Sequence, residues 1–531
     1  MSDESEAPEE GWRVLEVNER FSRSVLWTLM KEYYDRKGPT AWHGEVPNYS
    51  TCNTFIAKSY AEVVMAYLHE LTRTNAIDTS QPVYIVELAA GIGAFAHYFL
   101  HAFGALKEQS SLRGLDVRYL MTDFTQSNLK AWREHPDLLP FLKGGLLDIG
   151  KFDVDTDDAI ELANGSLTAG SCKNPIVILA NYAFDTFRND IFCVERGQLN
   201  EVGLTSRAPT TEPIELAQVQ TRYAQRSIDP SSYYDEPLYN QLLADYRALL
   251  VDATFMIPVG SLRALDRLLD VSGGRGLLLS SDKGFTHVDE LFQPNPQAMQ
   301  LHGSFSVMVN YHAIGRYAAL RGGVYSATST RMMSLKTAMC VFSPESAPFV
   351  DTLSTFRRRI DQFGPGEFFE FFRVERTAQK SVEQIISLLR LSGYDPALLY
   401  NYSHTIREQC RNLPDWVVFE LRSALERTWR NYFIGPGNLP FELARILLGL
   451  GQPLEAARFN QIAIDCFGEL PAAYLNMGIC YYNAENPQQA LVCFERAAAL
   501  DPELGPPREW IARIAAERGR RLPPSVVRPR S

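Results

Sequence analysis

The stretch Val83-Tyr84-Ile85-Val86-Glu87-Leu88-Ala89-Ala90-Gly91-Ile92-Gly93-Ala94-Phe95 decides the fold of this chain. A β-branched apolar run ends in an acid, turns through a glycine-containing loop, and restarts with the apolar spacing of a helix. A strand, a tight loop and a helix N-terminus in this order are typical of the first βα unit of a nucleotide-binding sheet.

The residues of the loop favour S-adenosylmethionine over a dinucleotide as the cofactor. An acid at the strand end, Glu87, followed by Gly91 and Gly93, suits a ligand with a cationic methionine end and no pyrophosphate. A dinucleotide loop would place a third glycine where Ala96 stands. A nicotinamide-dependent oxidoreductase is therefore the least favoured function. The alternative to a cofactor-binding loop is a plain strand–helix turn that binds no ligand.

Length and charge narrow the class of protein. The 531 residues are enough for two or three domains, and 46% hydrophobic with 22% charged residues is an ordinary soluble composition. A net charge of −11 argues against nucleic-acid binding. Because the sequence shows no apolar run of membrane-spanning length and no signal peptide, we expect a cytoplasmic protein that does not bind membranes.

The cysteines and histidines indicate neither a disulfide framework nor a metal site. The eight cysteines are scattered without a C-x-x-C pair, which predicts reduced thiols. The nine histidines show no paired metal-ligand spacing. Residues 1–11 are acidic and polar, and we expect them to form a disordered tail.

Strands and helices alternate from Val83 to about Phe342, which predicts an α/β sheet. The expected strands are Val83–Glu87, Val117–Met121, Gly145–Leu147, Ile176–Leu179 and Gly276–Leu279. Between the fourth and fifth lies a long insertion that begins like a hairpin and continues in polar, tyrosine-rich helices. The residues before the sheet, from Trp12 to Leu71, are expected to be helical around a polar interruption.

The C-terminal part is predicted to be wholly helical and to contain an internal repeat. Tetratricopeptide spacing occurs over 471–504, where large residues such as Tyr474 fill one helix and small residues such as Ala490 let the next approach. The same positions recur 34 residues earlier, over 437–470. We expect a helical linker or degenerate repeats over 346–436, a capping helix ending near 519, and a solvated basic tail over 520–531. Such repeats present a groove to a protein partner or protein substrate.

Polar residues follow four of the expected strands. They are Glu87, Asp123, Asp148 with Asp153 close behind it, and Asn181. Because ligands of open α/β sheets bind at the carboxyl ends of the strands, these residues predict a cofactor crevice. Asp123 could accept from ribose hydroxyls, and the carboxylates at 148 and 153 from the adenine amino group. The alternative is that each acid caps a helix.

On these residues the chain from about Gly38 to Phe342 resembles the MidA-like methyltransferases, whose mitochondrial members are protein-arginine methyltransferases that assist assembly of respiratory complex I. The family's first motif, Val-Glu-Leu-Gly-x-Gly-x-Gly, is similar to 86–93. Its motif Ala-Asn-Glu-Phe-Phe-Asp-Ala-Leu-Pro is similar to 180–188, and its Asp-Tyr-Gly to 282–284. The resemblance covers somewhat over half of the chain and excludes the helical C-terminal part.

The resemblance implies a Rossmann-like class I methyltransferase sheet with an inserted subdomain, over 12–345, followed by an all-α tetratricopeptide domain. It implies that S-adenosylmethionine is the cofactor and that the catalytic residues are Asn181, Tyr182 and Asp185. The cofactor-binding candidates are Glu87, Ala89, Gly91, Gly93, Asp123, Phe124, Asp148 and Asp153. The loop Trp42-His43-Gly44 is a candidate cover for the pocket.

Two departures from the family pattern bear on mechanism. Ala89 stands where the loop backbone of the family has a glycine, and it adds a methyl group to a close contact. Tyr182 stands where the family has a glutamate, so that only Asp185 remains of the acidic pair that would hold a guanidinium. Arginine methylation is therefore not expected. The sequence leaves two hypotheses: a methyltransferase acting on a protein or another nitrogen or oxygen acceptor, or a catalytically silent scaffold that works through its repeats.

Overall fold

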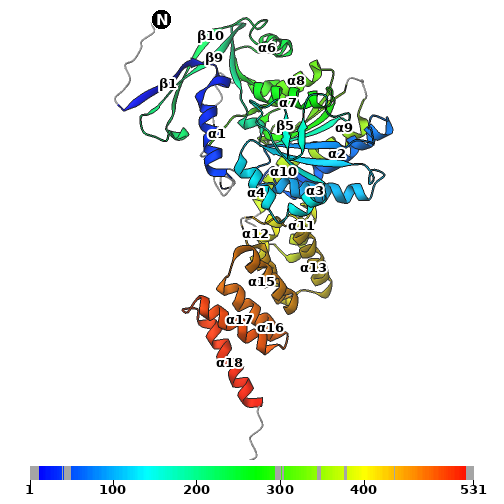
Figure 1. The fold of residues 1–531 in the computed structure, drawn as a ribbon, viewed down its shortest axis with the longest axis vertical. Coiled ribbons are helices and arrows are strands. Elements are labelled where there is room, and N and C mark those ends of the chain that lie inside the picture. The colour runs from blue at the N-terminus through cyan, green and yellow to red at the C-terminus, as the bar shows by residue number, and fades with distance from the viewer. Residues whose placement is uncertain are drawn as a thin grey trace, which may run out of the picture. The chain divides into compact units, whose positions relative to one another are not determined.

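The computed structural model describes residues 11–38, 40, 49–292, 300–301, 304–343, 348–375, 380–435 and 437–521. The chain forms two compact units, Met1–Arg373 and Val374–Ser531 (Figure 1). The Trp42-His43-Gly44 loop, the first ten residues and the last ten lie outside the described residues.

Over the described residues of the first unit, ten strands form one mixed sheet in the order β16-β17-β12-β7-β2-β3-β4-β5-β6, with β15 paired to β12. The central strands β4, β3, β2, β7 and β12 run parallel, and β17 is antiparallel to β12. Their bounds are β2 Val83–Leu88, β3 Val117–Asp123, β4 Leu147–Lys151, β5 Ile160–Leu162, β6 Gly165–Leu167, β7 Ile176–Asn181, β12 Gly276–Phe285, β15 Val309–Asn310, β16 Val324–Ala327 and β17 Leu335–Phe342.

Helices cover both faces of this sheet, which is why its central strands are apolar on both sides. On one face lie α2 (Thr54–Arg73) and α3 (Ala94–Glu108), and Phe99 of α3 packs on Tyr119 of β3 with ring centroids 5.3 Å apart. On the other face, α7 (Val259–Val271) and α8 (Tyr311–Leu320) share one buried core with Val86 and Ile178. Figure 1 shows the two helical layers on either side of the strands.

The order of the parallel strands reverses beside β2. Its neighbours are the strand that follows it in sequence, β3, and the distant strand β7, with Leu88 in register with Ala180. Loops that leave two such strands diverge to opposite sides of the sheet and leave room for a ligand at the carboxyl edge. The fold therefore places its natural crevice where the loops after β2 and β7 begin.

A second, antiparallel sheet is built mostly from the insertion. Its order is β1-β9-β8-β11, with β10 paired to β9; the insertion supplies β8 Asp190–Glu195, β9 Gln198–Pro209, β10 Gln220–Ser227 and β11 Ala253–Ile257. The predicted hairpin is confirmed as β8 and β9. The expectation of helices after it was only partly right, because 220–227 form a strand before α6 (Pro237–Leu249).

The remaining strand of this sheet corrects the prediction for the N-terminal region. Trp12–Glu19 is strand β1, not helix, and it pairs antiparallel with β9. Because β9 lies nearly two hundred residues further along the chain, no local sequence pattern predicts this pairing. The helical expectation holds for α1 (Val25–Lys37), whose N-terminus is capped by Ser24, and for α2.

The shorter elements complete the first unit. They are η1 Phe21–Arg23, α4 Gln126–Glu134, α5 Leu139–Lys143, η3 Phe184–Thr186, η4 Leu216–Gln218, η5 Val288–Leu291, β13 Gln300–Leu301, β14 Phe305–Ser306, α9 Val350–Phe356, η6 Arg357–Asp361 and α10 Pro365–Glu375. The unit extends past residue 345 because α9 is fastened to α2. Glu70 of α2 accepts hydrogen bonds from the backbone amides of Asp351 and Thr352, which open α9.

The second unit is helical throughout its described residues. Its helices are α11 Val382–Leu391, α12 Pro396–Gln409, η7 Cys410–Asn412, α13 Asp415–Arg430, α14 Leu439–Gly449, α15 Pro453–Phe467, α16 Pro471–Asn483, α17 Pro487–Leu500 and α18 Gly505–Arg521. Helices α16 and α17 approach closely because Gly478 has no side chain: a Cβ there would lie 2.4 Å from the ring of Phe494. Trp510 of α18 stacks on the same ring, with centroids 5.5 Å apart, and covers the end of the pair.

The described residues lack two features, a membrane-spanning helix and a metal-binding cluster. No helix among them is long and apolar enough to cross a membrane. Nor do any three of their histidine, cysteine, aspartate or glutamate side chains group as ligands for a metal ion. All eight cysteines are present as free thiols.

Candidate functional site

Two cavities lie at the carboxyl edge of the parallel strands and share two lining residues, Ala89 and Tyr182. The larger cavity lies between β2, β3, β4 and α1 and holds about 740 Å³ of empty space, counting its open mouth. The smaller holds about 390 Å³ and is lined by the loop after β2 and by residues of β7 and the segment before α2. We call them the β3 cavity and the β7 cavity.

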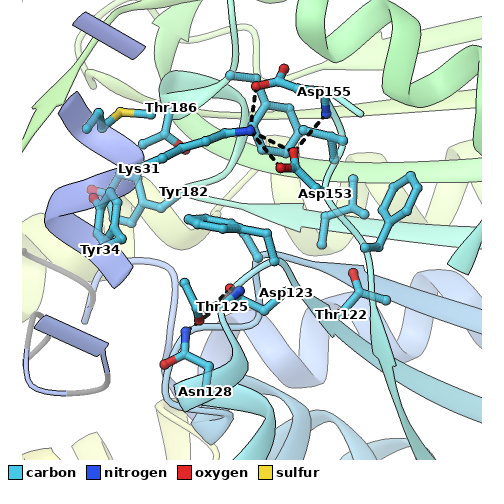
Figure 2. A pocket seen from close by; sticks show the side chains of 17 residues that line it. Lys31, Tyr34, Thr122, Asp123, Thr125, Asn128, Asp153, Asp155, Tyr182 and Thr186 are labelled. Atoms are coloured by element: carbon cyan, nitrogen blue, oxygen red, sulfur yellow. Dashed lines mark hydrogen bonds and ion pairs between the residues drawn. The ribbon is translucent and has the colours of Figure 1, made fainter. Parts of the chain in front are cut away.

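Asp123, at the end of β3, is buried in the wall of the β3 cavity. Its Oδ1 accepts from the backbone amide and the hydroxyl of Thr125, each at 2.9 Å, and its Oδ2 accepts from Asn128 Nδ2 at 3.0 Å (Figure 2). Burial raises the pKa of the Asp123 carboxyl, and these hydrogen bonds offset part of the rise. Asp123 thus holds the start of α4 and also lines the cavity.

Phe124 and Asp153 line the same cavity from the loops after β3 and β4, and a lysine from α1 reaches them. Lys31 Nζ lies 2.7 Å from Asp153 Oδ1 and 2.7 Å from Asp155 Oδ2, and 5.6 Å from the centre of the Phe124 ring. Figure 2 shows the lysine side chain extended across the cavity to both carboxylates.

Asp155 also binds Arg188, whose Nε lies 2.8 Å from its Oδ2. Burial alone would raise the pKa of the Asp155 carboxyl, but Lys31 and Arg188 outweigh burial and lower it. Lys31 and Arg188 therefore form one connected set of ion pairs with the carboxylates of Asp153 and Asp155 beside the β3 cavity.

Glu87 lines the β7 cavity and is only 4% exposed. Its Oε2 accepts a hydrogen bond of 2.9 Å from the hydroxyl of Tyr119. Burial raises the pKa of the Glu87 carboxyl to about 8, although the bond from Tyr119 works in the opposite direction. At neutral pH this residue is therefore mostly the uncharged acid.

Asn181 and Tyr182 reach the β7 cavity from the end of β7. The Asn181 Oδ1 accepts from the Tyr60 hydroxyl at 3.0 Å, while its Nδ2 donates to the Thr51 carbonyl at 3.4 Å. The Tyr182 hydroxyl lies 2.8 Å from Ser50 Oγ. Burial raises the pKa of Tyr182 to about 12. These bonds tie the segment before α2 to the end of β7.

Ala89 and Tyr182 both adopt the left-handed backbone conformation that favours glycine, with φ of 50° and 46°. The neighbouring loop glycines do so too: φ is 55° at Gly91, which lines the β7 cavity, and 84° at Gly93, where α3 begins. A Cβ at Gly93 would lie 2.8 Å from Met121 Cε, the movable end of a side chain, so the positive φ is the main reason for a glycine there. Gly93 lines neither cavity.

Two predicted site residues besides Gly93 lie outside both cavities. Asp148 was expected to follow a strand, but β4 begins at Leu147, so that Asp148 lies inside the strand with its Oδ1 on the amide of Ile149. Asp185 lies in η3, 5% exposed, beside the buried Asp282. Burial raises the pKa of both carboxyls, that of Asp185 to about 7. The neighbouring Asp185 raises the pKa of Asp282 further, whereas a hydrogen bond with Asp282 works against the rise at Asp185.

Several residues that line the β3 cavity were not predicted from the sequence. They are Met30, Lys31, Tyr34, Thr125, Asn128, Asp155, Thr186 and Phe187. Those after strands could have been found by extending each strand end by a few residues. No sequence signal marks Lys31, because α1 reaches the cavity through the packing of the whole N-terminal segment.

Two solved structures from Burkholderia thailandensis, both of the COG1565 superfamily, were found among structural neighbours. One, an uncharacterised protein, is 14% identical, with 64% of this chain and 90% of that chain covered and a TM-score of 0.39. The other, bound to S-adenosyl-homocysteine and inferred to be a methyltransferase, is 15% identical, with 67% and 86% covered and a TM-score of 0.39.

Comparison with curated proteins found no match. The family model of the tetratricopeptide repeat matches residues 471–504, which form the hairpin of α16 and α17. The prediction of a repeat with these bounds is confirmed. Residues 471–504 are a tetratricopeptide repeat.

Proposed function

We propose that this chain is a methyltransferase that binds S-adenosylmethionine across the two cavities and uses its tetratricopeptide region to hold a protein partner or substrate. One observation carries the proposal: two cavities meet at Ala89 and Tyr182, beside the point where the strand order reverses. A nucleoside and an amino acid joined at sulfur need two such compartments and a narrow passage between them. The order β4-β3-β2-β7-β12 agrees with a Rossmann-like sheet.

In this proposal the β3 cavity takes the nucleoside. Asp123 would accept from the ribose hydroxyls, Phe124 would lie against the base, and Asp153 would face its amino group. The β7 cavity would take the methionine end, close to Glu87 and Gly91. Asp148, Gly93 and Asp185 have no direct contact with the ligand in this arrangement, because they line neither cavity.

When bound, the cofactor supplies a methyl group on a sulfonium, which is a good leaving group. The task of the protein is then to orient the acceptor and exclude water. Tyr182 would wall the passage between the cavities, held by its bond to Ser50. Asn181 would fix the end of β7 through its bonds to Tyr60 and Thr51. The acceptor is a protein or another nitrogen or oxygen nucleophile.

Calorimetric titration of the full chain with S-adenosylmethionine and S-adenosylhomocysteine, with NADH as a comparison, tests the proposal. Asp123→Asn should weaken binding about tenfold or more, since hydrogen bonds to a charged group are lost. Asp148→Asn is the matched control, because this acid lies inside β4, and it should leave binding unchanged. Binding of NADH alone would overturn the proposal in favour of an oxidoreductase.

A silent scaffold is the second candidate, and specific observations favour it. Asp185, the remaining acid of the motif, is buried against Asp282 outside the cavities, and Ala89 holds a backbone conformation suited to glycine. Failure of well-folded protein to bind either sulfur ligand would favour this candidate. The tetratricopeptide repeat would then be the working surface.

A further inference from the structure

Lys31 makes three contacts with carboxylate oxygens inside the β3 cavity. Its Nζ lies 2.7 and 2.9 Å from the two oxygens of Asp153 and 2.7 Å from Asp155 Oδ2. The side chains of this lysine and of the two acids are 22%, 19% and 11% exposed. An ammonium group has three N–H donors, and three carboxylate oxygens stand within reach of them.

The acceptors of Asp153 are largely used by this arrangement. Oδ1 takes the lysine and also the backbone amide of Asp155 at 3.0 Å, and Oδ2 takes the lysine. Asp155 shares its Oδ2 between Lys31 and Arg188, which is itself held by the Ser22 carbonyl at 2.6 Å. A ligand that donates to Asp153 therefore meets the lysine at both oxygens and competes with it for them.

The lysine comes from a separate, well-anchored element. Helix α1 begins at a capped Ser24, and Glu16 of β1 accepts from the amide of Val25 at 2.8 Å. Because its backbone is held at the N-terminal end, Lys31 can leave Asp153 by side-chain rotation without unfolding of the helix. The competition is thus between one flexible side chain and a ligand.

We propose that Lys31 is a specificity-determining residue of the crevice: its ammonium group occupies Asp153 in the place of the 6-amino group of the base and competes with it. The inference rests on the proposed function, since it concerns the base of the same cofactor. A base with the amino group competes with the lysine for the carboxylate oxygens. A base with a carbonyl oxygen at that position offers no donor to Asp153 and gains nothing from the removal of the lysine.

Titration of the full chain with S-adenosylhomocysteine and with S-inosylhomocysteine, whose base has a carbonyl oxygen in place of the amino group, tests this. Lys31→Met keeps the length of the side chain and removes the charge. It should tighten binding of the adenosyl compound about tenfold, as when one competing charge-assisted hydrogen bond is removed. It should not tighten binding of the inosyl compound, whose carbonyl oxygen loses the ammonium group as a donor. In Lys31→Met/Asp153→Asn the gain should disappear. Lys37→Met, on the same helix and outside the cavity lining, controls for loss of a charge.

The outcomes separate this inference from the proposed function. Equal affinity of wild type and Lys31→Met for S-adenosylhomocysteine, or an equal gain for both compounds, overturns the role of Lys31 and leaves the cofactor site standing. If neither protein binds S-adenosylhomocysteine but Lys31→Met binds adenosine more tightly, the methyltransferase proposal fails and the competition stands. If neither protein binds S-adenosylhomocysteine or adenosine, both fail. A thermal melt of each variant verifies that it is folded.

Discussion

Ala89 and Tyr182 are each the first residue beyond a strand, in neighbouring parallel strands, and both line the two cavities with a left-handed backbone. The register places Leu88, just before Ala89, beside Ala180. The two residues thus lie where the two cavities adjoin. Both are also among the positions at which the sequence departs from the motifs it resembles.

The backbone at Ala89 predicts that Ala89→Gly stabilises the protein. A left-handed conformation costs a residue with a Cβ about 1–2 kcal/mol. Glycine removes this cost, but it also makes the unfolded chain more flexible, which offsets part of the gain in stability. We expect the free energy of unfolding to rise by about 0.5–1 kcal/mol in urea titration. Ala90→Gly, at a neighbouring position without positive φ, should lower it by a similar amount. Destabilisation by both would contradict the prediction.

The buried Glu87 predicts a loss of stability in alkali. Its pKa is 4.5 in the unfolded chain and about 8 in the fold, so the folded state retains the proton across that window. The contribution of Glu87 to the free energy of unfolding is therefore complete below pH 4.5, falls as the pH rises, and is lost above about pH 8. Glu87→Gln should match wild type below about pH 4.5 and exceed it by a growing margin as the pH rises to about 8. Glu87→Ala leaves the Tyr119 hydroxyl without its acceptor and should cost about 1–3 kcal/mol.

The Asp185–Asp282 pair predicts a second pH dependence, at lower pH. The pKa of Asp185 is raised from 3.8 to about 7 by burial, and the proximity of Asp282 raises the cost of a second charge. The contribution of Asp185 to stability is present below pH 3.8 and declines as the pH rises through about 7. Asp185→Asn should flatten this decline in urea titrations at pH 5 and pH 8. An unchanged slope, with Asp148→Asn as control, would remove Asp185 from the coupled pair.

The tetratricopeptide hairpin predicts a sharp cost for a single methyl group. Gly478→Ala places a Cβ 2.4 Å from the Phe494 ring, which is itself held by Trp510. Overpacking of this kind costs about 1–3 kcal/mol, more than alanine gains as a helix former. Thermal unfolding of the full chain should show the helical transition shifted down. Val492→Ala, at a position 57% exposed on α17, should have little effect.

Local periodicity made much of the fold predictable. The strands at 83–88, 117–123 and 176–181 and the repeat at 471–504 follow from apolar spacing over a few residues, which the sequence displays directly. The start of β4 was placed too early, because the strand continues past Leu147 with apolar Ile149 on the far side of Asp148. That shift moved Asp148 from an expected strand end to the inside of a strand.

The sequence by itself determined the α/β alternation, the loop after β2, and the tetratricopeptide repeat, because each depends on residues close together along the chain. Only the tertiary structure decided that β1 joins a distant sheet, that Lys31 reaches Asp153, and that Asp185 is buried beside Asp282. Each of these depends on groups about 100 to 190 residues apart brought together by packing. Charge, burial and pKa at the crevice follow from that packing, and no short stretch of sequence carries them.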